Sequence, residues 1–237
     1  MKLLRKLKKY AGKIKACREN KISLMARRTC YEVIGSDNVI QIAERNISKR
    51  MRKISIFVDG DCNTIKIGEN FDLKGHCIVR IIGNNNEILI GDNVGVVNTL
   101  TIQILKSCRN GRVEVGDNTT FWKTAVQNYD NGSSVRIGSD CMFSYDTAVL
   151  NSDEHAILKD GNVINCAEHL DIGNHVWVGY GAAIMKNAKL ADNCIVGRSA
   201  LVAGSFLEKG SVVAGVPAKV IKRGVDWSRR SVNDFTP

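Results

Sequence analysis

The sequence is poor in proline and aromatic residues and lacks long apolar runs. It has two prolines in 237 residues, and aromatic residues make up 6% of it. No apolar run approaches the roughly 18 residues that span a bilayer, and the basic start lacks the apolar stretch of a secretory signal. Glycine, asparagine, valine and isoleucine are frequent, which favours short strands and tight turns over a helical bundle.

The chain has no CxxC pair, although it contains eight cysteines. They occur singly and mostly among apolar neighbours, which excludes a dense disulfide framework or a cysteine metal site. We therefore expect no metal and reduced thiols in a cytoplasmic protein. The cysteines are Cys17, Cys30, Cys62, Cys77, Cys108, Cys141, Cys166 and Cys194.

The net charge of +10 is confined to the N-terminal segment. Residues 1–30 hold 11 lysines and arginines against a single acid, Glu19, which leaves 23 bases and 23 acids in the remaining 207 residues. A nucleic-acid-binding body would need its own basic face. A neutral body argues against nucleic acid as a partner.

The first 17 residues place apolar side chains at helical spacing, with lysines and arginines between them. Leu3, Leu7, Tyr10, Ile14 and Cys17 form this stripe, which predicts a basic amphipathic helix within a helical segment, residues 1–30. Residues 1–28 could contact an anionic membrane surface, each base contributing about 1 kcal/mol. That contact would place the protein at the inner face of the cytoplasmic membrane. The alternative is a helix packed on the body or on a neighbouring subunit.

From about residue 31 to 223 the chain repeats, most clearly in hexads that start at Ile172. They read IGNHVW, VGYGAA, IMKNAK, LADNCI and VGRSAL, with an aliphatic first residue and a small or apolar fifth residue. A period of six is neither helix nor simple strand. It predicts a coil with three flat faces, followed by a tail, residues 224–237. Earlier signals (IGEN, IGDN, VGDN, IGSD) are more than 18 residues apart, so the early coils should have longer faces or small loops.

These hexads resemble the hexapeptide-repeat acyltransferases, most strongly over residues 115–223. The stretch from IGSDCMFSYDTAVLNSDEH to IGNHVWVG, and the closing VVAGVPAKVIK, are most similar to bacterial capsule and sialic-acid O-acetyltransferases. The resemblance implies an all-β fold, a left-handed parallel β-helix. It also implies acetyl-CoA as co-substrate, a homotrimer with sites between subunits, and a glycan or lipid-linked glycan as acceptor.

The stretch NSDEHAI breaks the six-residue register. Counting sixes from Ile137 places Asp153 and His155 where the repeat requires inward residues, and burying both without partners would cost several kcal/mol. We therefore expect the chain to leave the coil, with residues 156–171 forming an excursion beside a site. The resemblance implies that His155 is the general base, a task that suits imidazole at neutral pH. Asp153 could orient the ring or cap the turn.

The donor site can be placed only through the resemblance. Trp177 falls at an outward position, where a ligand or a subunit should cover it, and the related enzymes have a tryptophan beside acetyl-CoA. Small residues after it would let a pantetheine arm lie close, and lysines in PAKVIK match basic positions near the CoA phosphates. Arg198 stands at a position where many members of that family have a small residue. The expected donor residues are Trp177, Gly179, Tyr180, Gly181, Ala182, Arg198, Lys219 and Lys222.

The leading hypothesis is an O-acetyltransferase for a bacterial surface polysaccharide such as a capsule, a sialic-acid polymer or an O-antigen. The alternative within the fold is an acetyltransferase for a small acceptor: a nucleotide-sugar amine, a free sugar, serine or an antibiotic. A γ-type carbonic anhydrase shares the fold, but the four histidines do not reproduce its spacing. A non-catalytic scaffold would give His155 and outward Trp177 no purpose.

Overall fold

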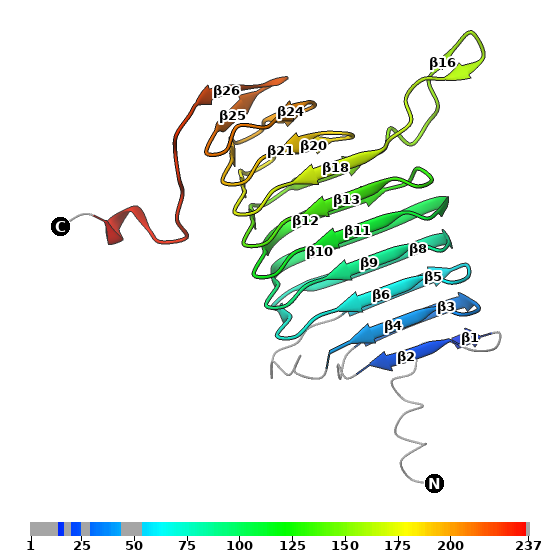
Figure 1. The fold of residues 1–237 in the computed structure, drawn as a ribbon. Helices are drawn as coiled ribbons and strands as arrows, with labels where there is room; N and C mark the ends of the chain where they lie inside the picture. Colours follow the sequence, from blue (N-terminus) through cyan, green and yellow to red (C-terminus); the bar gives the residue numbers. More distant parts are fainter. Residues whose placement is uncertain (1–13, 17–19, 25–28, 44–53, 236–237) are drawn as a thin grey trace.

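The chain winds into a parallel β-solenoid, in which each strand pairs with its equivalent in the next coil (Figure 1). The structure is a computed structural model, and it describes residues 14–16, 20–24, 29–43 and 54–235. One side of the solenoid is a nine-stranded sheet. Its strands, in spatial order, are β2 (Lys21–Leu24), β4 (Val39–Ile42), β6 (Thr64–Ile67), β9 (Glu87–Ile90), β11 (Arg112–Val115), β13 (Ser134–Ile137), β18 (His169–Ile172), β21 (Lys189–Leu190) and β24 (Ser205–Phe206).

A 15-stranded sheet forms the other two sides. Its main path is β1 (Ile14–Ala16), β3 (Thr29–Gly35), β5 (Ile54–Asp59), β8 (His76–Asn84), β10 (Gly95–Arg109), β12 (Thr120–Asn128), β14 (Met142–Phe143), β19 (Trp177–Val178), β22 (Ile195–Val196), β25 (Val212–Gly215) and β26 (Ala218–Lys222). Off this path lie β7 (Asp72–Leu73), β15 (Thr147–Asn151), β20 (Ala183–Met185) and β23 (Leu201–Val202). The long strand β12 turns a corner, because its start pairs with β14 and its end with β15.

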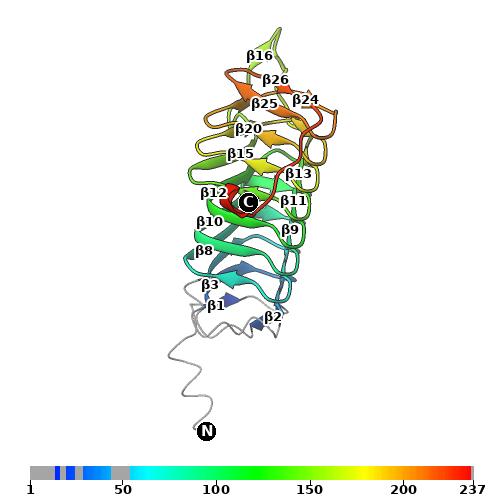
Figure 2. The same ribbon diagram turned by 90° about the vertical axis from the view of Figure 1, so that its left-hand side faces the viewer.

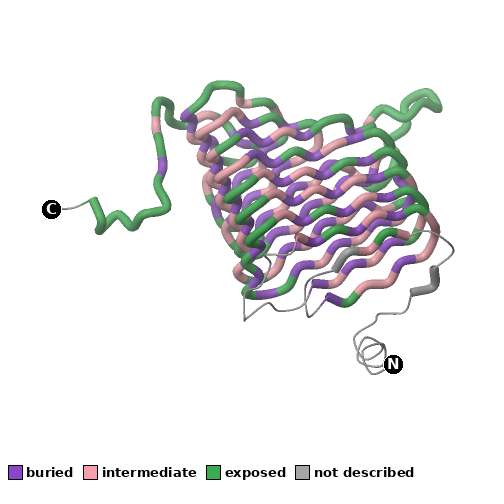
Figure 3. The backbone as a smooth tube through the Cα atoms, turned by 60° about the horizontal axis from the view of Figure 1, so that its bottom comes forward, coloured by how far each residue is buried: buried purple, intermediate pink, exposed green. Residues whose placement is uncertain are grey.

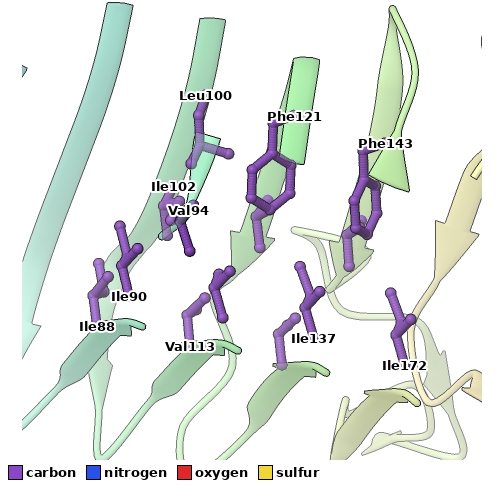
Figure 4. Close-up of a cluster of buried hydrophobic side chains, with 14 of the residues drawn as sticks. Ile88, Ile90, Val94, Leu100, Ile102, Val113, Phe121, Ile137, Phe143 and Ile172 are labelled. Carbon is purple, nitrogen blue, oxygen red and sulfur yellow. The ribbon is translucent and has the colours of Figure 1, made fainter. Parts of the chain in front are cut away.

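The core runs along the axis of the solenoid as stacked columns of aliphatic and aromatic side chains (Figure 4). Burial alternates along each strand (Figure 3), since successive side chains of a strand point to opposite sides. Phe121 and Phe143 stack with ring centroids 4.9 Å apart. The first and fifth hexad positions between Ile172 and Val202 are all buried, which confirms the interpretation of the repeat.

The N-terminal helix predicted for residues 1–30 is wrong where the structure describes this segment. Residues 14–16 form β1, which pairs with β3, and residues 21–24 form β2, which pairs with β4. The solenoid therefore begins before residue 31. Residues 1–13 and 17–19 lie outside the described residues, so a helix over 1–13 and the membrane contact stay predictions. Within the described part of the chain, no helix is long and apolar enough to cross a membrane.

The chain leaves the coil between β15 and β18, where NSDEHAI breaks the repeat. Residues 152–168 form the excursion, which carries the antiparallel hairpin of β16 (Leu158–Lys159) and β17 (Asn162–Val163) away from the coils (Figure 1). The expected boundaries of 156–171 are shifted. Residues 169–172 already belong to the coil, because β18 pairs in register with β13.

Candidate active site

His155 lies in a turn directly after β15, at the base of the excursion. Its N–H donates to Asp153 O at 2.7 Å, and Glu154 between them has a left-handed φ of 60°. The imidazole is exposed and forms no hydrogen bond with the rest of the described chain. A cavity of about 160 Å³ opens beside it, lined also by Asp130, Ser152 and Cys166. A free imidazole at a cavity mouth is available to an incoming hydroxyl.

Asp153 does not contact the His155 ring, which corrects the orienting role considered for it. Its carboxylate forms an ion pair with Lys186 and accepts a hydrogen bond from Asn165 Nδ2 at 2.9 Å. The contacts with Lys186 and Asn165 hold the pKa of the Asp153 carboxyl below its usual range. Asp153 therefore belongs to the anchoring of the excursion on the coil.

Trp177 points outward from β19 and is half-buried, as expected, but its cover comes partly from the same chain. The Trp227 ring of the tail lies 6.1 Å from it, tilted by 44°. The indole Nε1 of Trp177 is buried and has no acceptor among the described residues. Trp177 thus keeps one hydrogen-bond donor that a bound molecule could satisfy.

The tail after β26 runs back beside the coils to the level of β12, a feature that sequence reasoning missed (Figure 2). It ends in the 3-10 turn η1 (Val232–Asp234). Trp227 stacks on His175 at 4.2 Å, and its Nε1 donates to His175 O at 2.8 Å. Arg229 donates to Thr120 Oγ1 at 2.7 Å and to Cys141 O at 2.9 Å. The sequence signal that could have indicated this packing is a tryptophan and an arginine within an otherwise polar tail.

The turn after Trp177 combines ligand-accessible and purely structural residues. A Cβ on Gly179 would meet Val196 O at 2.7 Å, so the stacking of the coils requires this glycine. Gly181 has a φ of +68°, a left-handed conformation that Asp146 and Ser199 also adopt at the stacked corners, so the fold does not require glycine there. Ala182 is fully buried, which removes its side chain from the expected donor contacts. Tyr180 is 45% exposed, and the Arg198 guanidinium lies 4.8 Å from its ring centroid.

Lys219 and Lys222 lie exposed on β26, at the C-terminal end of the solenoid. Neither forms an ion pair with another described residue, whereas Arg223 pairs with Glu208 at 2.7 Å. A straight outer row of register partners connects Trp177 to Lys222 through Ile195 and Val212. With strands 4.7–4.9 Å apart, this donor row is about 14 Å long.

His155 and the donor row are not brought together within one chain. His155 follows the end of β15, whereas Trp177 and Tyr180 precede β20, which pairs with β15 in parallel. The five residues of β15 separate the two groups by about 13 Å or more. Among the residues that the structure describes, no cluster of three histidine, cysteine or acidic side chains could hold a metal ion.

Comparison with known proteins gives close relatives in one family. No protein-family model matches the chain. The polysialic acid O-acetyltransferase of Neisseria meningitidis is 30% identical over 202 residues, which cover 84% of this chain and 90% of that protein. The crystal structure of the polysialic acid O-acetyltransferase OatWY aligns with a TM-score of 0.73 at 28% identity, covering 87% of this chain and 99% of the other.

The polySia-specific acetyltransferase NeuO has the same fold, with a TM-score of 0.73 at 24% identity over 87% of this chain and 92% of the other. The prediction of an all-β, left-handed parallel β-helix is thereby confirmed. The stretches around DEH and VWVG carried the resemblance, and they stand at the exposed histidine and the outward tryptophan. The chain is a member of the hexapeptide-repeat acyltransferases and belongs to the family of the bacterial polysialic acid O-acetyltransferases.

Proposed function

We propose that the protein transfers the acetyl group of acetyl-CoA to a hydroxyl of a bacterial surface polysaccharide, with His155 as general base. The observation that carries this proposal is the free, exposed imidazole at the cavity beside the break in the coil. Capsule, sialic-acid polymer and O-antigen are the candidate acceptors. A small acceptor remains the alternative, because nothing in the cavity excludes a free sugar or a nucleotide-sugar amine.

The chemistry needs one base that later acts as an acid. The imidazole takes the proton of the sugar hydroxyl while its oxygen attacks the thioester carbonyl, which gives a tetrahedral oxyanion. The oxyanion collapses, the carbon–sulfur bond breaks, and the imidazolium returns the proton to the leaving CoA sulfur. Sugar ester and free CoA are the products, and no acyl-enzyme is formed.

The donor row fits acetyl-CoA in its residue types. The unpaired indole N–H of Trp177 offers a hydrogen bond to an acyl or amide oxygen. Ile195 and Val212 provide an apolar path, and Lys219 and Lys222 place two unpaired cations at its end, where phosphates would be attracted. Arg198 and Tyr180 flank this row on the adjoining corner.

We also propose a homotrimer, because His155 and the donor row of one chain are too far apart to act on one acetyl group. The outer side of β12, β15, β20 and β23 is mostly apolar, with Gln127 as a polar member of the Leu150 row, and we call its apolar residues the apolar face. Its residues are Ala125, Ala148, Leu150, Ala183, Met185 and Leu201. A neighbouring copy packed there would bring its donor row towards His155. The mass in solution should then be about three times 26.1 kDa.

The decisive experiment compares wild type with His155→Ala on a panel of bacterial glycans and small acceptors. CoA formation is followed by chromatography, and labelled acetyl transfer identifies the acceptor. We expect glycan-dependent turnover that falls by roughly 10²-fold or more in the variant. His169→Ala, which alters an exposed histidine on β18, is the matched control and should keep wild-type turnover. Equal rates for wild type and His155→Ala would disprove the base assignment.

Two readouts separate the acceptor classes. Release of labelled acetate by mild base indicates an ester, whereas an amide survives that treatment. Turnover with a free sugar or an amine but none with any glycan would favour the alternative function.

We place the enzyme in the cytoplasm, with residues 1–28 at the inner face of the membrane as a proposed contact. Vesicles with and without anionic lipid, sedimented with full-length protein, test that contact.

A further inference from the structure

The excursion needs a device that fixes His155, because the hexad register no longer holds the chain there. Lys186, which follows β20 on the coil, reaches into the base of the excursion. Its Nζ contacts the Asp153 carboxylate and donates to Asn165 O at 2.8 Å. The side chains of Lys186 and Asp153 are only 24% and 29% exposed. One lysine of the coil therefore holds the outgoing and the returning parts of the excursion together.

Asn165 connects this ion pair to His155. Its Nδ2 donates to Asp153 Oδ2 and to His155 O, both at 2.9 Å. Its Oδ1 accepts from Ile157 N at 2.8 Å. The backbone of His155 is thus held on both sides, since its N–H also donates to Asp153 O. The imidazole has no hydrogen bond of its own within the described chain, so these contacts position the ring by fixing the backbone that carries it.

A different residue, Asp130, joins the two ends of the excursion. It accepts from Ser152 Oγ and from Ala167 N, both at 2.7 Å. The contacts of Lys186 and Asn165 lie further out, directly around His155. A purely architectural role would not require this second set of contacts.

We propose that Lys186 and Asn165 are positioning residues for His155, acting through the Asp153 carboxylate and the His155 backbone. The inference depends on the proposed function, in which His155 is the base. Lys186 has a second effect, because its charge balances that of Asp153. The Asp153 carboxylate is thereby neutralised, whereas Glu154, which is exposed in the same cavity, pairs with no described cation.

The test uses Lys186→Met in the full-length protein, with wild-type turnover as the reference. A misplaced base lowers kcat by roughly 10- to 100-fold, while the KM for acetyl-CoA stays unchanged because the donor row is not touched. Lys186→Arg should recover part of kcat. Asn165→Ala should lower kcat in the same way. The double variant Lys186→Met, Asp153→Asn should be more active than Lys186→Met alone, since it removes the uncompensated charge.

Lys189→Met is the matched control, because Lys189 is an exposed lysine on β21 that pairs with no described acid. It should retain wild-type kcat and melting temperature. Asp130→Asn should lower the melting temperature more than it lowers kcat. If Lys186→Met lowers only the melting temperature and keeps wild-type kcat, the positioning role is wrong. If His155→Ala itself keeps wild-type turnover, the proposed function fails first, and the two failures are distinguishable.

Discussion

At the scale of single residues, the role of Asp153 is determined by Lys186, a partner 33 residues further along the chain. Its pKa is lowered by Lys186, so its carboxylate is charged at neutral pH. A lowered pKa stabilises the fold at pH values above the ordinary carboxylate value. That contribution disappears as the pH falls through the lowered value. The ion pair of Asp153 and Lys186 should therefore persist at neutral pH and weaken only in acid.

The cysteines give a prediction at the same scale. Burial raises the pKa of the Cys77 thiol to about 12, so it holds almost no thiolate at pH 8. The seven described cysteines are all free, and Cys30, Cys62 and Cys166 are exposed. We expect a thiol reagent at pH 8 to label the three exposed cysteines within minutes. Cys77 should be labelled only after the protein is unfolded. Mass spectrometry of peptides from native and unfolded protein measures this.

Cys166 adds a functional readout, because it lines the cavity beside His155. Its modification by a bulky reagent should abolish turnover, and Cys166→Ser should remain active and resist the reagent.

For the labelling experiment, rapid reaction of Cys77 in the native state would contradict the burial of the core. Loss of activity in Cys166→Ser after treatment would assign the inhibition to another thiol.

The sequence predicted single residues well where the repeat itself was informative. His155 and Trp177 stand at a break and at an outward position, and both can be counted from the hexads. Lys186 could not be found this way, because it meets Asp153 across 33 residues only when the coils are stacked. The buried status of Ala182 was available from its fifth hexad position, which made its assignment to the donor site inconsistent with the repeat.

At the scale of elements, the tail is the part that the sequence did not predict. Trp227 is buried although residues 224–237 carry no repeat, and Arg229 reaches Thr120, Asp140 and Cys141 across successive coils. Contacts between positions about 90 to 110 residues apart leave no local periodic signal of the kind that marks a helix or strand. Longer faces or small loops were predicted from spacings above 18, and the nine-residue strand β8, which pairs with β10 from Thr99 to Arg109, confirms the longer faces.

The helical prediction was wrong at residues 14–16 and 21–24 for a related reason. Ile14 and Cys17 fit a helical stripe, but the strands that compete with it gain their stability from β3 and β4, which follow in the chain. Helical propensity is a weak prior, and tertiary pairing overrides it. A short stripe of apolar residues cannot distinguish a helix from the first strand of a coil.

The tail supports a second prediction. Arg229→Ala removes charged hydrogen bonds to two successive coils, which should lower the free energy of unfolding by about 1–2 kcal/mol. The tail should then cover Trp177 less, and the tryptophan emission should shift to longer wavelength. Urea unfolding followed by fluorescence measures both effects. Arg230→Ala is the control, since Arg230 bonds only within the tail, at Asp234 O. Equal stability of the two variants would show that the tail is not held by Arg229.

At the scale of the whole molecule, the outer sides of the solenoid differ in character. The nine-stranded sheet carries charges of alternating sign, and Arg112 and Arg136 pair with Glu87 and Asp171 on neighbouring strands. Such a charged side resists association, because its charges would have to be desolvated. The side that contains β14 and β19 is partly occupied by the tail. The apolar face is left as the surface that gains most from a second copy.

This arrangement leads to the last prediction, a test of whether each site is shared by two chains. His155→Ala and Trp177→Ala should each be inactive as homotrimers. When they are unfolded, mixed in equal amounts and refolded, about a quarter of the sites should combine an intact His155 from one chain with an intact Trp177 from its neighbour. Activity should return to that fraction of refolded wild type. Mixing the folded variants without exchange should restore nothing.

A site built within one chain gives a different result, because every chain in the mixture then carries a defect and activity stays absent. Ala148→Arg is a second test, made on the apolar face, where Ala148 stacks between Ala125 and Ala183. A charged side chain there should produce folded monomers without activity, detectable by mass in solution. Active monomers of this variant would contradict the shared site. Inactive monomers together with recovery in the mixed trimers would place the acceptor base and the acetyl donor on opposite sides of a subunit boundary.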